Sequence, residues 1–258
     1  MKVATWNVNS IRARLPVVMR WLQESHVDVL AMQETKTMDN SFPVAEFEAL
    51  GYEVAMSGQK TYNGVAIASR SPISNVVKGW NGKDLSRVLA ADIEGVTVVD
   101  GYLPHGGERG DEAFEHKLQF FRDFRAYLDT TYERSRRLLL VGDFNVAREP
   151  RDVWAPDELE NAIGYMQEER DALEQLYGWG FVDLFRRFHP DEVQYTWWDY
   201  RMNMFKRNMG MRIDYAWGSE ALARMAVDCM VDVEPRRWEK PSDHTPVVTT
   251  VATHQGES

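Results

Sequence analysis

Polar side chains that can bind cations or move protons stand at the ends of several short apolar runs. Asn7 follows the first run, Glu34 the second, and Asp143 a run of leucine and valine. If these ends converge in the fold, one cleft holds four carboxylates, two or three amides and one histidine. The residues of this expected cleft are Asn7, Glu34, Asp143, Asn145, Asp214, Asp243 and His244.

This set of side chains suits a hard divalent cation. Magnesium prefers oxygen ligands from a few carboxylates, whereas zinc sites use cysteine or several histidines. Cys229 is the single cysteine and the histidines are scattered along the chain, which disfavours zinc. Carboxylates crowded into one cleft repel one another, and a cation relieves that repulsion. We therefore expect magnesium, or manganese in its place, with an anionic substrate such as a phosphate sharing the metal.

Each of these residues also has an ordinary structural explanation when it is taken alone. Glu34 suits a solvated loop or a helix cap, and Asp143 follows a glycine, as turn formers often do. The pair Asp243-His244 suits a cap with an incidental histidine. The functional interpretation gains weight because all of these residues stand at the ends of expected strands.

Short runs rich in β-branched residues alternate with stretches of helical spacing. We expect strands over 27–32, 64–68, 88–93, 96–102, 138–141, 213–217 and 246–251, and helices over 15–24, 114–132 and 158–177. Ile93-Glu94-Gly95-Val96 predicts a tight turn between paired strands. The pattern indicates a mixed α/β (α+β) fold rather than strict βαβ alternation. We expect one domain over 1–252 and a flexible tail over 253–258.

Eight motifs carry a resemblance to a known family. They span nearly the whole chain, in the family's order, over residues 6–12, 30–36, 62–66, 101–104, 142–147, 195–201, 210–215 and 241–247. Gln33-Glu34-Thr35-Lys36 and Ser242-Asp243-His244-Thr245-Pro246 are the most specific. The sequence resembles the exonuclease III type of abasic-site endonuclease, in the endonuclease/exonuclease/phosphatase superfamily.

The resemblance implies a four-layer αββα sandwich, with two mixed sheets packed face to face and helices outside. It also implies a metal-dependent phosphodiesterase that incises DNA 5′ to abasic sites, or acts as a 3′→5′ exonuclease and 3′-end-cleaning enzyme. By position, Glu34 resembles the main metal ligand, with Asn7 close by and Asp243 as a further ligand or an orienting group. The residues that resemble catalytic groups are Asp143, which activates water, Asn145, which orients phosphate, the pair Asp214 and His244, and Tyr102 at the phosphate or leaving group.

The resemblance further implies contacts with DNA. Segment 201–212 holds four basic residues, four methionines and no acid, which suits phosphates and base steps, or else a loop whose methionines seal the core. Trp197, Met211 and Ile213 resemble an apolar pocket for a flipped abasic sugar, with plain core as the alternative. The remaining expected DNA contacts are Lys36, Arg109, Lys117 and Arg201. Arg109 and Lys117 could instead be solvated surface residues. His105 departs from the amide that is common in the family.

The formal net charge of −10 is segregated along the chain. Segment 157–174 holds seven acids and one arginine, which indicates a helix turned to solvent, whereas 201–212 is basic. Binding to intact duplex should therefore be weak and strongly salt-dependent. A single cysteine and the absence of an apolar leader or spanning run favour a cytoplasmic protein without membrane contact. We expect a monomer that acts on double-stranded DNA with abasic sites or 3′ ends.

Two alternatives remain at this point. One is a related metal-dependent phosphoesterase that acts on a non-DNA phosphoester, such as a phosphoinositide. The other is a DNA-binding module on a decayed enzyme fold. It is disfavoured because the whole set of expected catalytic residues is present.

Overall fold

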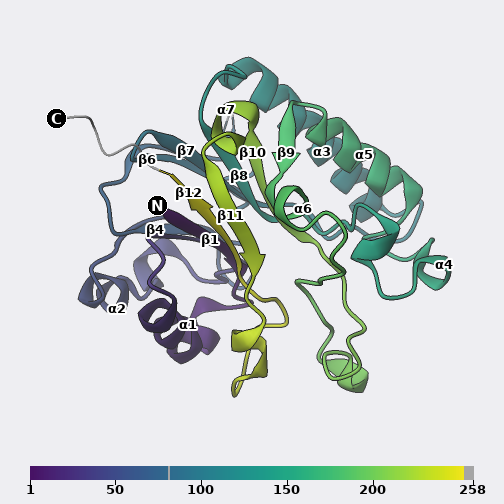
Figure 1. The fold of residues 1–258 in the computed structure, drawn as a ribbon, viewed down its shortest axis with the longest axis horizontal. Helices are drawn as coiled ribbons and strands as arrows, with labels where there is room; N and C mark the ends of the chain where they lie inside the picture. The colour runs from purple at the N-terminus through teal and green to yellow at the C-terminus, as the bar shows by residue number, and fades with distance from the viewer. Residues whose placement is uncertain (81, 253–258) are drawn as a thin grey trace.

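The computed structural model describes residues 1–80 and 82–252, so the tail expected over 253–258 lies outside the described residues. Within the described part, twelve strands form two six-stranded sheets (Figure 1). The first sheet has the order β11-β12-β1-β2-β4-β3, with β1 Lys2–Asn7, β2 Val29–Gln33, β3 Glu53–Ser57, β4 Val65–Ser69, β11 Ala226–Val231 and β12 Val247–Val251. The second has the order β5-β6-β7-β8-β10-β9, with β5 Ser74–Lys78, β6 Val88–Ile93, β7 Val96–Tyr102, β8 Leu138–Asp143, β9 Phe181–Asp183 and β10 Asp214–Ser219.

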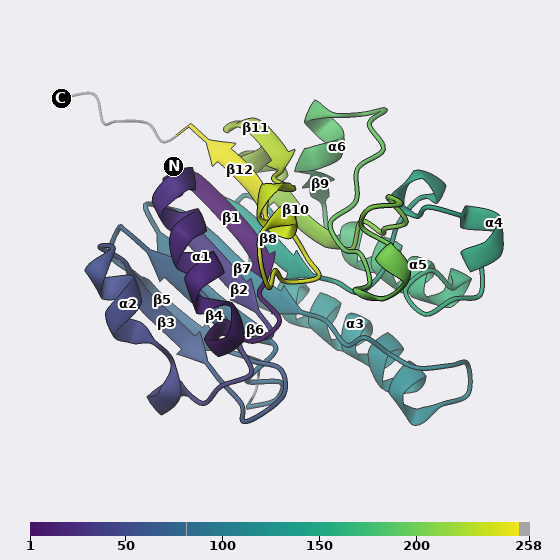
Figure 2. The same cartoon turned by 90° about the horizontal axis from the view of Figure 1, so that it is seen from below.

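Helices cover the outer faces of both sheets, as Figure 2 shows from below. The α-helices of the described residues are α1 Ile11–Ser25, α2 Val44–Ala49, α3 Glu112–Thr131, α4 Pro156–Leu159, α5 Gln167–Tyr177, α6 Leu184–Phe188 and α7 Glu220–Ala223. Side chains of α1 and α2 pack on the first sheet, and those of α3 and α5 pack on the second. None of these helices is long and apolar enough to cross a membrane.

The central strands are buried on both faces, which explains their continuous apolar sequences. On β2, Val29 and Ala31 face the opposite sheet, while Leu30 and Met32 face the helices. Strand β8 alternates in the same way, with Leu139 and Val141 between the sheets. The four-layer αββα sandwich expected from the sequence is confirmed.

Each sheet contains one parallel pair of strands. Strand β1 pairs with β2 through the crossover helix α1, and β7 pairs with β8 through α3. All other neighbouring strands in the two sheets pair antiparallel. Parallel strands end at the same sheet edge, so Asn7 lies opposite Gln33 and Tyr102 opposite Asp143. These paired ends supply the polar side chains of the site.

Local turn chemistry explains one confirmed prediction and one wrong one. Ile93 pairs with Val96 across a two-residue turn in which Glu94 and Gly95 both have positive φ, as a tight hairpin requires. The single helix expected over 158–177 is wrong, although the acids of the segment face solvent as expected, except for the buried Glu169. The chain leaves α4 at Leu159 and re-enters a helix only at Gln167, with a left-handed residue at Gly164.

Gly142 gives the sharpest test of the parallel β7–β8 pair. It has a φ of 139°, and a Cβ there would lie 1.9 Å from the Gly101 carbonyl oxygen. We expect Gly142→Ala to lower the free energy of unfolding by about 3 kcal/mol, measured from urea transitions. Gly95→Ala is the control, because its φ is also positive and its Cβ would meet no atom within 4 Å. It should cost only about 1 kcal/mol, and equal losses would show that close strand approach is unimportant.

Candidate active site

Three acidic or basic side chains meet where the carboxyl ends of the central strands converge. Glu34, Asp143 and His244 each offer a ligand atom, and those atoms lie within 4.8 Å of one another. Glu34 follows β2, Asp143 ends β8, and His244 precedes β12. The convergence expected from the sequence therefore exists, and it joins residues of both sheets.

The Asn7 amide holds two of these carboxylates. Its Nδ2 donates to Glu34 Oε1 and to Asp143 Oδ2, both at 2.8 Å. Its Oδ1 accepts from the backbone N–H of Asn9 at 3.0 Å. Asn7 thus contacts the carboxylates through nitrogen and orients them, while its expected role as a metal ligand stays a prediction.

The donor set fits a hard cation. Glu34 and Asp143 supply carboxylate oxygens, as such ions prefer. The Lys36 ammonium lies 2.8 Å from Glu34 Oε2 and donates to Asn9 Oδ1 at 2.6 Å. A positive charge therefore already lies beside the Glu34 carboxylate. Asp243 lies outside the three-residue group and uses its oxygens to accept from Asn9 Nδ2 and Trp197 Nε1. Its geometry favours the orienting alternative.

Asp214 orients His244 and keeps it charged. The His244 Nδ1 lies 2.9 Å from Asp214 Oδ2, and this oxygen also accepts from Thr196 Oγ1 at 2.6 Å. The Nε2 atom faces Asp143 Oδ2 at 3.7 Å. Burial alone would lower the pKa of His244, but the carboxylates of Asp214 and Asp143 outweigh it and raise this pKa. The ring therefore carries a positive charge toward the cleft.

Asp143 and Tyr102 face the same cleft from the second sheet. Asp143 Oδ1 accepts from the backbone N–H of Asn145 at 2.9 Å, and burial raises the pKa of the Asp143 carboxyl against the opposing charge of His244. Burial, with Glu34 and Asp143 nearby, also raises the pKa of Tyr102. A neutral phenol can donate a hydrogen bond to an anion at this position.

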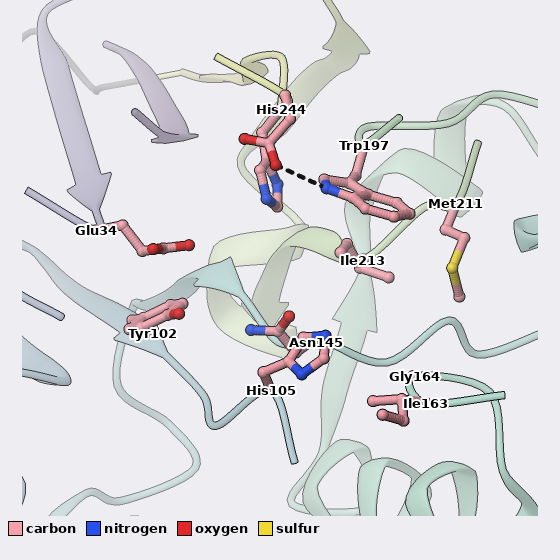
Figure 3. A pocket seen from close by; sticks show the side chains of 11 residues that line it. Glu34, Tyr102, His105, Asn145, Ile163, Gly164, Trp197, Met211, Ile213 and His244 are labelled. Atoms are coloured by element: carbon pink, nitrogen blue, oxygen red, sulfur yellow. Dashed lines mark hydrogen bonds between the residues drawn. The ribbon is translucent and has the colours of Figure 1, made fainter. Parts of the chain in front are cut away.

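A cavity of about 230 Å³ adjoins the carboxylates (Figure 3). One side is polar, with Glu34, Asn145 and His244, and the other is apolar. The apolar side consists of Trp197, Met211, Ile213 and Ile163. The Trp197 indole is fixed by its bond to Asp243, drawn as a dashed line in Figure 3. Trp197, Met211 and Ile213 therefore line a cavity rather than only filling core.

The structure corrects two expectations about basic residues. Lys117 was expected to reach a DNA phosphate or to be solvated, but its side chain is fully buried and pairs with Glu169 at 2.6 Å. Arg212 belongs to the basic segment 201–212 that is expected to meet DNA, but its side chain is buried and pairs with Asp152 and Asp183. The acidic partners of Lys117 and Arg212 are far away in the sequence. The sequence around each basic residue therefore does not predict these pairs.

The other expected DNA contacts lie at the surface in ion pairs. Arg109 pairs with Glu168, and Arg201 pairs with Asp199. Such exposed pairs are weak and leave the guanidinium groups available to phosphate. Their contact with DNA stays a prediction.

Sequence reasoning did not propose three residues of the site. Ile163 and Gly164 line the cavity, as His105 does, and Asn9 links Lys36 to Asp243. Asn9 stands in the first family motif and could have been found there. Ile163 and Gly164 fall in a segment with no strand-end pattern and no motif, so no sequence signal marked them.

Comparisons with known proteins agree with this geometry. The model of the Endonuclease/Exonuclease/phosphatase family matches residues 4–244. The chain is 33% identical to Exodeoxyribonuclease III of Haemophilus influenzae, over 96% of this chain and 98% of that protein. Among solved structures, an AP endonuclease from Archaeoglobus fulgidus is 41% identical with a TM-score of 0.95, over 97% and 99% of the two chains. The 3′ phosphatase NExo from Neisseria, bound to product DNA hairpin, is 38% identical with a TM-score of 0.93, over 98% and 99%.

The family match includes the helices, all strands except β12, and the carboxylate cluster as far as His244. The Haemophilus and Archaeoglobus relatives match along nearly their whole length. The expected resemblance is therefore confirmed. The chain belongs to the endonuclease/exonuclease/phosphatase family, as a nuclease of the exodeoxyribonuclease III type.

Proposed function

We propose that this nuclease repairs double-stranded DNA with magnesium, or manganese, as its cofactor. It cleaves the phosphodiester 5′ to abasic sites, and it removes groups or nucleotides from 3′ ends. We further propose that it acts as a monomer, as a single domain over 1–252, in the cytoplasm. The observation that carries the proposal is the small apolar cavity directly beside the carboxylate cluster.

The size and lining of the cavity favour a sugar without a base. A volume of about 230 Å³ is small for a ligand pocket, and Trp197, Met211 and Ile213 give it an apolar wall. An abasic nucleotide also unstacks from a duplex at less cost than an intact one. The solved relatives, an AP endonuclease and a 3′ phosphatase with DNA, support this class of substrate.

The residues of the cleft divide the work of phosphodiester hydrolysis. Asp143, buried and held by Asn7 and Asn145, takes the proton of the attacking water. His244, charged by its contact with Asp214, offsets the negative charge of the phosphate. Tyr102, as a neutral phenol, donates to the phosphate or to the leaving oxygen.

Glu34 would hold the metal, with Asn7 beside it, and Asp143 faces the same place from the opposite sheet. The ion, when bound, acts as a Lewis acid on the phosphate oxygens and stabilises the leaving oxygen.

A duplex with one abasic site, incubated with magnesium or with chelator, tests substrate and cofactor together. We expect incision on the 5′ side of the lesion with magnesium and none with chelator. Matched duplexes with intact sites and with 3′-phosphate ends measure the other activities. Cleavage of lipid phosphoesters without cleavage of any DNA would contradict the proposal.

Asp143→Asn tests the assignment of the base. The amide keeps the size of the carboxylate but cannot accept a proton, so kcat should fall by about 10³-fold. DNA affinity, measured by fluorescence anisotropy in chelator, should change little. Turnover close to wild type at saturating magnesium would show that another group activates the water.

Glu34→Ala tests the metal site. We expect the magnesium concentration for half-maximal activity to rise at least about tenfold, because one carboxylate ligand is lost. Glu24→Ala removes an exposed carboxylate of α1 that pairs with Arg20, and it serves as the control. Identical magnesium titrations for both variants would exclude Glu34 as a ligand.

A further inference from the structure

A fully buried ion pair lies behind the cavity. Lys117 on α3 and Glu169 on α5 have no exposed side-chain surface, and Lys117 Nζ lies 2.6 Å from Glu169 Oε1. Neither residue contacts the space in which the reaction takes place, because neither lines the cavity. Burying two charges is costly and rarely stabilises a fold by itself, so this pair calls for an explanation other than stability.

The pair binds the backbone of three segments that form the cavity. Lys117 Nζ donates to the carbonyl oxygens of His105 at 2.9 Å and Asn145 at 2.8 Å. Glu169 Oε2 accepts from the backbone N–H groups of Gly164 at 2.7 Å and Met166 at 3.0 Å. His105, Asn145 and Gly164 all line the cavity. One ion pair therefore connects three walls that are far apart in sequence.

The hydrogen bonds of Lys117 fix the position of its ammonium group. An ammonium group has three N–H donors, and all three have acceptors here, the two carbonyl oxygens and Glu169. The backbone is also shaped around the side chain, since Gly106 has a φ of 83° and a Cβ there would lie 2.7 Å from Lys117 Cδ. The position of Lys117 thus fixes the positions of the loops that it binds.

The position of α3 in the topology explains how the Lys117–Glu169 pair can reach the loops of the site. Helix α3 is the crossover from β7 to β8, so its first turns lie near the carboxyl ends of both strands. Tyr102 ends β7 and Asp143 ends β8. The pair therefore holds the loops that leave these two strands against each other and against the loop before α5.

We propose that Lys117 and Glu169 form a positioning pair, which sets the Asn145 amide and the Gly164 wall of the cavity at the distance from Asp143 that cleavage requires. The proposal rests on the proposed function for its kinetic consequence but not for its structural one. It also replaces the expected contact of Lys117 with DNA, because an ammonium with three internal partners binds no phosphate.

Two variants and one control test the proposal. Lys117→Met removes the ammonium, and Glu169→Gln keeps an oxygen for the two N–H groups but places an amide against Lys117. Leu128→Ala is the control, since Leu128 is fully buried in the same helix and packs in the core away from the cavity. For each protein, kcat and KM on abasic duplex are measured per folded molecule, together with salt dependence and hydrogen exchange.

We expect kcat to fall by about 100-fold in Lys117→Met and roughly tenfold in Glu169→Gln, because small displacements of catalytic groups are costly. The salt dependence of KM should stay that of wild type, whereas loss of a phosphate contact would reduce it. Hydrogen exchange should rise over residues 144–147 and 163–166 in both variants. Leu128→Ala should lower the stability of the protein but keep kcat, and it should show no rise in hydrogen exchange over these two segments.

Other outcomes separate the possibilities. A kcat near that of wild type in Glu169→Gln, or the same fall in Leu128→Ala, would overturn the positioning role. A reduced salt slope with unchanged kcat would restore Lys117 as a DNA contact and also overturn it. If Lys117→Met does not fold, Glu169→Gln decides. If wild type does not cleave the duplex, the proposed function fails, and local exchange alone then decides whether the pair holds the cavity walls.

Discussion

The Asn7 amide joins the two sheets at the cleft. It donates from one nitrogen to Glu34, which follows the neighbouring strand of its own sheet, and to Asp143 at the end of a strand in the opposite sheet. The first sheet contains the parallel pair β1–β2 and the second contains β7–β8. The Asn7 amide lies where the carboxyl ends of these two pairs meet. Two carboxylates are thereby held close together although their charges repel each other. The rest of the site depends on this constraint, because a cation and a charged histidine both become favourable there.

Buried charge is compensated locally throughout this half of the molecule. His244 lies between Asp214 and Asp143, and Arg212 lies between Asp152 and Asp183. Arg212 stands between Met211 and Ile213 in the sequence, and both of these neighbours line the cavity. Networks of this kind lose much when one member is removed, so they specify one geometry more than they add stability. A cavity of one fixed shape beside the carboxylates is what the proposed selection of a small, unstacked sugar requires.

The sequence was sufficient where the signal was local. The ends of apolar runs predicted the strands that carry Asn7, Glu34 and Asp143, and the family motifs placed Trp197 and Met211 at the pocket. It was insufficient where the outcome depended on distant partners. Lys117 and Arg212 have residue types that are usually exposed, and only the fold brings Glu169, Asp152 and Asp183 to them. The prediction of one helix over 158–177 was wrong for a similar reason. Gly164 has a positive φ and lines the cavity, and the helical spacing of the sequence does not indicate this turn.

The central claim is that Glu34, which Asn7 holds close to Asp143, is the metal ligand of a DNA repair nuclease. Anomalous diffraction from crystals grown with manganese tests it most directly, since the ion is located without reference to activity. The account predicts a peak against the Glu34 carboxylate, on the side that faces Asp143. A peak at some other site, or no peak at Glu34 in protein that incises abasic DNA with manganese, would contradict it.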